Sequence, residues 1–488
     1  MKLNNIYKSF VATLVTGFAI TSCTPNIDAP AVSKGTATFT KYVAIGNSLT
    51  AGFADGGVYR EGQLNSYPNL IATQFKTVGG GEFRQPLFTE AGSNGSGYLK
   101  LIGFAGGRPV IRPETTKLGV VGVSVGATGN RTPLYEKFTT TVDNLGIPGI
   151  RISDIKTNGY GFNNPAGFNP YFQRLLPETQ PTATDIGGAI SYLQYLQKYY
   201  ATEKPTFFTC WLGNNDALGF ATSGGTTPLT PSATFQSLYK ELMGVVVTGG
   251  AKGVVATIPN VTSIPYLNTV KYADVKANLP AAKAAFKIGV SRALNNTPPN
   301  ETPPALPPAL DQLIEGSMDD IYIRYADGSV NKATAADLFI LTATDSIGST
   351  RVRVSVPGVP VPLPFPKGFS RFNPLDHPSV LDNKEIAAAL TAVTAYNVAI
   401  RAEAAIVNIP VFDANALLTE FVSGKTVNGL TLNAGFITGG IFSLDGVHAT
   451  QRGYAIMANE FIRVANAAYN ANIPQVDITR YPGVAIKQ

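Results

Sequence analysis

Two histidines are present in this chain of 488 residues, His377 and His448. Imidazole is the side-chain group that exchanges a proton most readily near neutral pH, so these two residues are the candidates for a general base. His448 closes the run Asp445-Gly446-Val447-His448. A carboxylate three residues before a histidine in a tight loop can orient the ring and stabilise its charged form. Asp445 and His448 therefore suit the orienter and the base of a nucleophilic mechanism.

The other histidine and the cysteines indicate different roles. His377 also follows an aspartate, but it precedes a proline in an inserted region, and we expect a structural or loop-capping role for it. Cys210 lies in the apolar run Thr206–Leu212 and is expected in the core. Because Cys23 is expected to carry a lipid and Cys210 to be buried, the sequence predicts no disulfide and no metal site. It predicts no dinucleotide cofactor either, because no G-x-G-x-x-G motif follows a strand and precedes a helix.

Polar motifs follow four short apolar runs of the kind that forms strands buried on both faces. The runs and the motifs after them are Phe39–Ile45 before Gly46-Asn47-Ser48-Leu49-Thr50, Pro205–Leu212 before Gly213-Asn214-Asn215-Asp216, Gly253–Ile258 before Pro259-Asn260, and Ala405–Val411 before Phe412-Asp413. Helix-like segments lie between or after them, at Asp185–Tyr200, Ser232–Val247, Lys271–Leu294, Asn383–Ala404 and Thr450–Ala471. Alternating strands and helices predict an α/β fold with a parallel sheet, which binds ligands at the carboxyl ends of its strands.

Four motifs in chain order resemble the sequence blocks of the SGNH (GDSL-type) hydrolase family. They are Gly46-Asn47-Ser48-Leu49, Asn144-Leu145-Gly146-Ile147-Pro148-Gly149, Gly213-Asn214-Asn215-Asp216 and Asp445-Gly446-Val447-His448. Each motif alone is weak evidence, but all four occur in the family's order. The resemblance implies a three-layer α/β/α fold, similar to that of flavodoxin, in a lipoprotein form with large insertions.

The resemblance also implies a role for each block. Ser48 would be the nucleophile, with His448 as its base and Asp445 holding the histidine. The oxyanion that forms on a carbonyl would be stabilised by the N–H groups of Ser48 and Gly149 and by the Asn215 side chain. One such donor typically lowers the barrier by about 2.7–4 kcal/mol. The implied activity is a metal-independent serine esterase that acts through an acyl-enzyme on carboxylic esters, such as glycan O-acetyl, lipid or aryl esters.

Two features keep other interpretations open. Asn47 stands where the family's motif has aspartate, so this position can form hydrogen bonds but supplies no charge. Each block by itself is also compatible with an ordinary turn or a helix cap. The alternative hypothesis is a surface lipoprotein that binds glycans or a partner on the same scaffold without turnover.

The N-terminal residues predict export. Lys2 and Lys8 precede the apolar stretch Phe10–Ile20, which is too short to cross a bilayer and is followed by Thr21-Ser22-Cys23. This pattern resembles a bacterial lipoprotein signal with Cys23 as the lipidated residue, and a plain secretory signal is the alternative. We therefore expect a lipid anchor in a membrane of the bacterial cell envelope, with the protein exposed to the periplasm or the cell surface.

The length and the composition bear on domains and partners. We expect a signal at 1–22, a lipidated cysteine and tether at 23–37, a hydrolase domain at 38–475 with insertions at about 76–142 and 297–370, and a tail at 476–488. The insertion at 297–370 is predicted to be β-rich, as either a lid or a subdomain. The formal charge of +6 is spread along the chain without a basic block, so no nucleic-acid partner is expected. The oligomeric state is left open.

Overall fold

The computed structural model describes residues 31–138, 140–176, 189–357, 359 and 361–486. The main body is built on a five-stranded parallel sheet with the strand order β13-β8-β7-β1-β6. Its strands are β1 (Tyr42–Gly46), β6 (Asn144–Gly146), β7 (Phe207–Trp211), β8 (Lys252–Ala256) and β13 (Val411–Phe412). Every residue of β1 and β7 is buried, as expected for continuous apolar strands in the middle of a covered sheet.

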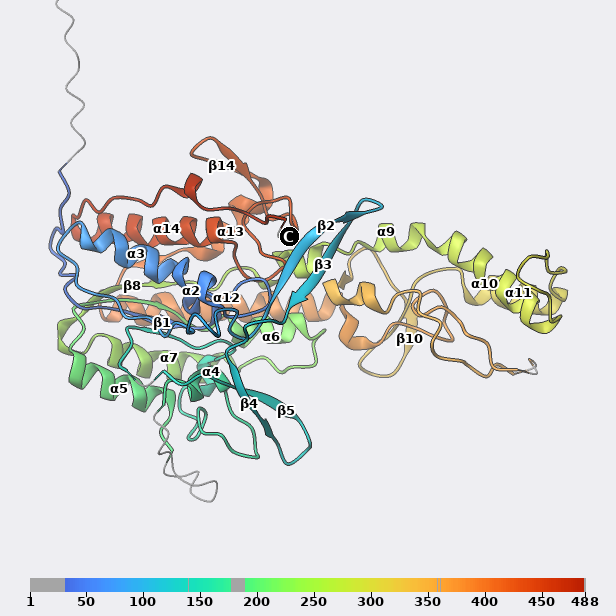
Figure 1. Cartoon of the computed structure of the whole chain (residues 1–488), viewed down its shortest axis with the longest axis horizontal. Helices are drawn as coiled ribbons and strands as arrows, with labels where there is room; N and C mark the ends of the chain where they lie inside the picture. The colour runs from blue at the N-terminus through green and yellow to red at the C-terminus, as the bar shows by residue number, and fades with distance from the viewer. Residues whose placement is uncertain (1–30, 139, 177–188, 358, 360, 487–488) are drawn as a thin grey trace, which may run out of the picture.

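Helices cover both faces of this sheet (Figure 1). One layer contains α3 (Tyr67–Lys76) and α14 (Gln451–Tyr469), which pack against each other. The opposite layer contains α5 (Tyr192–Glu203), α7 (Ser232–Val246) and α12 (Asn383–Ile406). The predicted three-layer α/β/α fold with a central parallel sheet is confirmed.

Two predicted elements have different boundaries in the structure. The strand expected at Ala405–Val411 is wrong over most of its length, because the apolar run first continues α12 to Ile406 and only its last residue enters β13. The helix expected at Asp185–Tyr200 starts outside the described residues, and α5 begins at Tyr192 after a capping box on Ser191. Periodicity shows that a segment is apolar, whereas its end depends on local capping and on the space beside the sheet.

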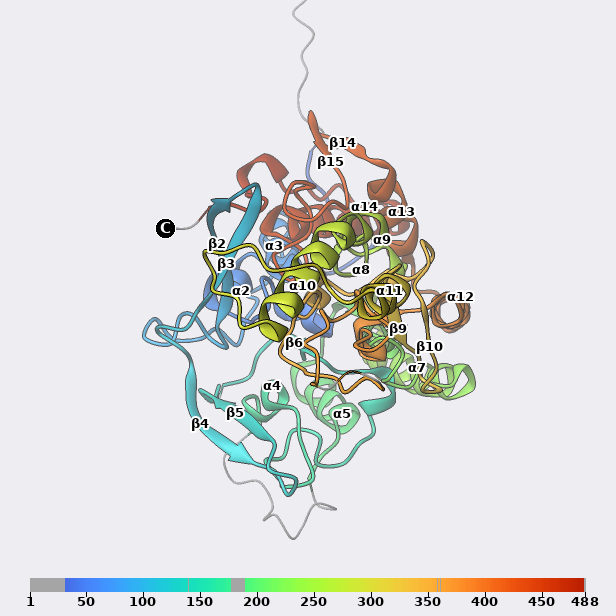
Figure 2. The same cartoon turned by 90° about the vertical axis from the view of Figure 1, so that its right-hand side faces the viewer.

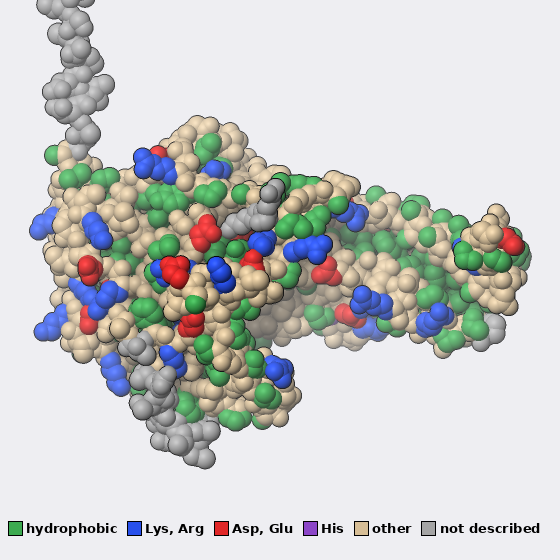
Figure 3. Space-filling view, viewed as in Figure 1, with side chains coloured by type: hydrophobic (Ala, Val, Ile, Leu, Met, Phe, Trp, Pro, Cys, Tyr) green, Lys and Arg blue, Asp and Glu red, His purple; other side chains and the backbone are tan. Residues whose placement is uncertain are grey.

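The first insertion forms two antiparallel hairpins that project from the body (Figures 1 and 2). One pairs β2 (Tyr98–Ala105) with β3 (Arg108–Glu114), and the other pairs β4 (Val120–Val125) with β5 (Arg131–Tyr135). On the face shown in Figure 3, lysines and arginines are interspersed with aspartates and glutamates and form no large patch of one sign.

The second insertion is an arm that extends from the body and has a hydrophobic core of its own, between Val270 and Val380 (Figure 1). The segment Lys271–Leu294, expected as one helix of the main fold, gives α9 (Tyr272–Ala277) and α10 (Leu279–Leu294), which pack in this arm. The remaining elements of the arm are α11 (Pro308–Ser317), β9 (Tyr322–Arg324), β10 (Val330–Lys332), β11 (Leu338–Phe339) and β12 (Val380–Leu381). This separate core also includes residues before and after the predicted insertion at 297–370.

Short elements complete the body. They are α1 (Ser48–Ala51), α2 (Arg60–Leu64), α4 (Pro170–Gln173), α6 (Asn215–Thr222), α8 (Pro265–Asn268), α13 (Ala414–Ser423), β14 (Lys425–Val427) and β15 (Leu430–Leu432). Of these, α1 and α6 directly follow the central strands β1 and β7, at the carboxyl edge of the sheet.

Both ends of the described chain are held by the body. The backbone of Ser33 pairs with that of Asn472, and Val476 exchanges two hydrogen bonds with the Asn459 side chain. Part of the predicted tether and the start of the predicted tail therefore pack against the main body. The predicted signal at 1–22 and Cys23 lie outside the described residues. Among the residues that are described, no helix has the length and apolar character to cross a membrane.

Candidate active site

Ser48 sits on a tight turn between β1 and α1. Gly46 ends the strand, and a Cβ at this position would lie 2.1 Å from Thr50 Oγ1, so the turn requires glycine. Asn47 is the N-cap of α1, and its Oδ1 accepts a hydrogen bond from the N–H of Leu49 at 3.1 Å. The Asn47 side chain therefore caps α1, and this cap requires a hydrogen-bond acceptor but no charge. The Ser48 side chain lies at the first position of α1, directly at the carboxyl edge of the sheet.

A continuous hydrogen-bonded chain links Ser48, His448 and Asp445. The distance from Ser48 Oγ to His448 Nε2 is 2.8 Å, and the distance from His448 Nδ1 to Asp445 Oδ2 is also 2.8 Å. The serine and the histidine are 400 positions apart in the chain, so the fold alone brings them together. The structure thus places all three residues that the sequence analysis named as nucleophile, base and orienter within direct hydrogen-bond reach.

The Asp445 carboxylate accepts several hydrogen bonds besides the one from His448. Its Oδ1 accepts hydrogen bonds from the N–H groups of Val447 and His448 and from the hydroxyl of Ser443, at 2.8–3.1 Å. Its Oδ2 accepts a second bond, from the N–H of Gly56 at 2.9 Å. Burial acts to raise the pKa of Asp445, but the neighbouring His448 and these hydrogen bonds outweigh it and hold the pKa far below its ordinary value. The side chain is therefore a carboxylate fixed in one orientation.

The loop after α1 contacts the loop that contains His448, through Phe53 and Asp55. The Asp55 carboxylate accepts a hydrogen bond from the N–H of Leu444 at 3.0 Å, and the Asp55 N–H donates to the Ser443 hydroxyl at 2.9 Å. The ring of Phe53 lies against the His448 imidazole with 4.4 Å between the ring centres. Sequence reasoning missed Phe53 and Asp55, and their only local signal is that they follow the serine motif by a few residues.

The three predicted oxyanion donors lie at the ends of neighbouring strands. Gly46 at the end of β1 is in register with Gly146 of β6 and with Trp211 of β7, so the loops that follow all three strands start at one edge. Gly149 has a φ of +82°, a conformation that favours glycine. The Asn215 amide donates a hydrogen bond to the Ile150 carbonyl at 2.9 Å and so touches the turn that contains Gly149. An amide NH2 group has two hydrogens, and this bond uses one of them.

Asp216 ties the two oxyanion loops together. Its carboxylate is 1% exposed and accepts hydrogen bonds from the N–H groups of Ile152 and Ser153, at 2.7 and 3.3 Å, and from the Thr230 hydroxyl at 2.6 Å. Burial raises the pKa of Asp216 to about 6. The sequence analysis matched this residue to a motif but assigned it no role, because the partners lie in distant segments.

The remaining candidates take structural positions. His377 pairs through Nε2 with Glu385 near the start of α12, at 2.6 Å, which fits the structural role expected for it. Cys210 is fully buried in β7, and burial raises the pKa of its thiol to about 12, so the prediction of a core cysteine is confirmed. Within the described part of the chain, no group of three or more histidine, cysteine, aspartate or glutamate residues is placed to hold a metal ion.

A three-layer parallel α/β fold with a serine, a histidine and a carboxylate in line at its carboxyl edge has the arrangement of a serine hydrolase. The model of the GDSL-like lipase/acylhydrolase family matches residues 42–461, most of the chain, and the protein belongs to this family. Membership of the family supports ester hydrolysis as the general activity. No curated protein matches the chain significantly. A solved structure, the lipase/acylhydrolase from Enterococcus faecalis, is similar with 12% identity and a TM-score of 0.31 over 89% of this chain and 99% of that chain, which is too distant to add to the argument.

Proposed function

We propose that this protein is a serine esterase that cleaves carboxylic esters through an acyl-enzyme on Ser48. The observation that carries the proposal is the pair of 2.8 Å hydrogen bonds that connect Ser48, His448 and Asp445. A serine hydroxyl is a weak nucleophile at neutral pH and needs a base within hydrogen-bond reach, which His448 supplies. The steps below require no metal ion.

In the first half of the reaction, Ser48 Oγ attacks the ester carbonyl carbon while its proton passes to His448 Nε2. The negative charge on the carbonyl oxygen is stabilised by the N–H groups of Ser48 and Gly149 and by the free hydrogen of the Asn215 amide. The intermediate then expels the alcohol, which takes the proton from His448 Nε2. Asp445 keeps Nδ1 protonated throughout, so that Nε2 faces the serine.

In the second half, water replaces the alcohol. It gives a proton to His448 Nε2 as its oxygen attacks the acyl carbon, and the same donors stabilise the second oxyanion. Collapse of this intermediate releases the carboxylic acid and returns the proton to Ser48 Oγ. The Asn215 amide and the Asp216 carboxylate support both halves, the first as a donor and the second by holding the donor loops together.

We further propose that the enzyme works in the bacterial cell envelope, attached to a membrane through a lipid on Cys23. The N-terminal pattern supports this location. The proposed substrates there are glycan O-acetyl, lipid or aryl esters. Labelling of the expressed protein with an alkyne fatty acid, in the wild type and in Cys23→Ala, tests the anchor. Equal labelling of the two would refute lipidation at Cys23.

The esterase proposal is tested with p-nitrophenyl acetate and a fluorophosphonate probe. We expect hydrolysis and covalent labelling in the wild type, loss of both in Ser48→Ala, and full retention in Ser355→Ala, a matched control at an exposed serine of the arm. Hydrolysis that persists in Ser48→Ala would reject Ser48 as the nucleophile. A folded wild type with neither hydrolysis nor labelling would favour the non-catalytic binding lipoprotein instead.

A further inference from the structure

Gly149 lies in a tight turn that directly follows β6. The turn is Ile147-Pro148-Gly149-Ile150, and the N–H of Ile150 donates to the Ile147 carbonyl at 3.2 Å. With proline second, glycine third and a Gly149 φ of +82°, it has the features of a type II turn. A type I turn differs from it by rotation of the central peptide, here the one between Pro148 and Gly149. The orientation of this peptide therefore decides where the Gly149 N–H points.

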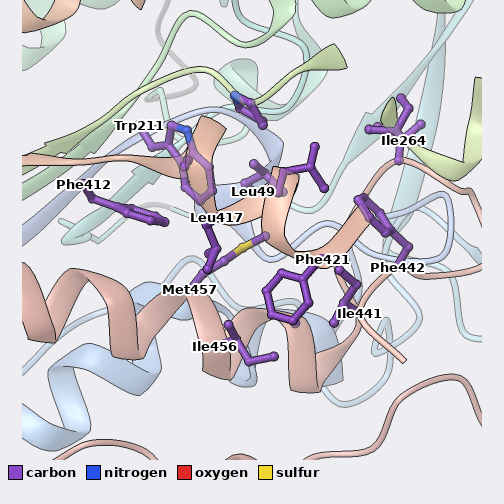
Figure 4. A pocket seen from close by; sticks show the side chains of 15 residues that line it. Leu49, Trp211, Ile264, Phe412, Leu417, Phe421, Ile441, Phe442, Ile456 and Met457 are labelled. Atoms are coloured by element: carbon purple, nitrogen blue, oxygen red, sulfur yellow. The ribbon is translucent and has the colours of Figure 1, made fainter. Parts of the chain in front are cut away.

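The Gly149 N–H is available to a ligand. Gly149 is exposed at the carboxyl edge of the sheet, and its N–H donates to no other group in the described part of the chain. By contrast, the pocket shown in Figure 4, which begins at Leu49 next to Ser48, is lined by apolar side chains. Its one polar side-chain atom, Trp211 Nε1, already donates to the Thr257 carbonyl at 3.1 Å. The side chains of this pocket therefore offer no donor to an oxyanion.

Asn169 fixes the orientation of the central peptide. Its Nδ2 donates a hydrogen bond to the Pro148 carbonyl at 2.8 Å. This peptide bond is trans, so its C=O and N–H groups point in opposite directions. Because the Pro148 carbonyl faces Asn169, which is only 8% exposed, the Gly149 N–H faces away from this buried side chain.

The Asn169 amide can take only one orientation. Its Oδ1 accepts hydrogen bonds from the N–H groups of Tyr171 and Phe172, both at 3.0 Å, at the start of α4. Its Nδ2 also donates to the Tyr160 hydroxyl at 3.1 Å. Both hydrogens and both lone pairs of the amide are thus used. A flipped amide would place its NH2 group against two N–H groups and its oxygen against the Pro148 carbonyl, so Asn169 is held as a donor to the turn.

Resting on the proposed esterase function, we propose that Asn169 is a positioning residue of the oxyanion hole. It holds the peptide between Pro148 and Gly149 in the orientation that presents the Gly149 N–H to the carbonyl oxygen of the substrate. Asn169 itself does not touch the substrate and acts through the turn. Because the N–H stabilises charge that develops only in the transition state, its orientation affects kcat rather than KM.

Asn169→Asp separates the donor from the helix cap. A carboxylate at this position still accepts from the two N–H groups at the start of α4. Its second oxygen repels the Pro148 carbonyl and accepts the Gly149 N–H once the peptide rotates, so the variant favours the opposite orientation. With p-nitrophenyl acetate we expect kcat to fall by about 10²-fold, as for loss of an oxyanion donor, with KM unchanged. A loss of kcat below tenfold would overturn the inference.

Asn164→Asp is the matched control. Asn164 is 4% exposed and donates to the carbonyls of Phe162 and Gly167 at 2.8 and 3.1 Å, while its Oδ1 accepts from the Ala166 N–H at 2.9 Å. None of these bonds reaches the turn that contains Gly149. We expect both variants to lower the urea midpoint to a similar extent, with kcat near the wild-type value only in the control. Equal losses of kcat in the two variants would show that Asn169 acts only through the stability of this segment.

An inhibitor and a crystal structure add readouts that do not depend on turnover. Ser48 Oγ adds to the carbonyl carbon of 1,1,1-trifluoroacetone, its proton passes to His448 Nε2, and the hemiketal keeps the oxyanion. We expect the inhibition constant to rise in Asn169→Asp by about the factor by which kcat falls, and a crystal structure of this variant to show a negative Gly149 φ.

These readouts also distinguish failure of the inference from failure of the esterase proposal. A wild type without Ser48-dependent hydrolysis would reject the esterase and, with it, the role of Asn169 in an oxyanion hole. Ser48-dependent hydrolysis in the wild type, together with an unchanged kcat and an unchanged Gly149 φ in Asn169→Asp, would keep the esterase and reject the positioning role.

Discussion

Replacement of Asp445 by asparagine tests the central geometry most directly. The Oδ1 position of Asp445 is fixed by three donors, so the new NH2 group takes the Oδ2 position, opposite His448 Nδ1 and the Gly56 N–H. An NH2 group cannot accept from either of them. The imidazole then accepts at Nδ1 and carries its proton on Nε2, where it can no longer take the proton of Ser48.

Asp445→Asn is expected to lower both kcat and the free energy of unfolding. The wrong tautomer lowers kcat by about 10⁴-fold in a serine–histidine–aspartate site, which is a barrier increase of about 5.4 kcal/mol at 1.36 kcal/mol per tenfold change. Because the Gly56 N–H loses its acceptor, the free energy of unfolding falls by about 1–3 kcal/mol. Asp445→Asn is therefore a folded protein whose main defect is in turnover.

The assay measures kcat on p-nitrophenyl esters and the free energy of unfolding in urea for each variant. Asp55→Asn is the matched control, because the Asp55 carboxylate holds the backbone of the same loop through Leu444 and accepts from the Tyr59 hydroxyl. We expect a similar loss of stability in Asp55→Asn, with kcat reduced less than tenfold. A folded Asp445→Asn that keeps more than a tenth of the wild-type kcat would refute the reasoning, as would equal losses of kcat in the two variants.

Three further predictions concern the turn and the oxyanion loops. Gly46→Ala places a Cβ 2.1 Å from Thr50 Oγ1 and is expected to lower the free energy of unfolding by about 1–3 kcal/mol, measured in urea; an unchanged midpoint would contradict the packing. Asn215→Ala removes a proposed oxyanion donor and is expected to lower kcat by about 10²–10³-fold with an unchanged circular dichroism spectrum, and a loss below tenfold would exclude the amide from that role. Because the Asp216 pKa is raised to about 6 in the folded state, the stability linked to its protonation is full below pH 4 and lost as the pH rises through 6. Between pH 4 and 7 the wild type is therefore expected to lose about 2 kcal/mol relative to Asp216→Asn in urea unfolding. A difference independent of pH would show that the pKa of this carboxyl is not raised.

Local sequence determined the pieces of the site. A short apolar run followed by Gly46-Asn47-Ser48 contains all that its turn needs, namely a residue without Cβ, a capping acceptor and a hydroxyl. Asp445 and His448 are close enough in the chain to form their own loop, and Thr450 caps the helix that follows them. These features depend on neighbours within a few residues, and so they can be predicted from spacing alone.

Only the tertiary structure decided which distant segments meet. Lys271–Leu294 has the apolar pattern of a helix, but the pattern does not say which core it covers, and it packs in the arm rather than on the sheet. Phe53 and Asp55 contact the loop that contains His448, and these residues are far apart in the chain. The hydrogen bond from the Ile152 N–H to the Asp216 carboxylate also joins two distant segments. Local spacing carries no information on such pairs, because they depend on strand order and on the loops that the sheet brings to one edge.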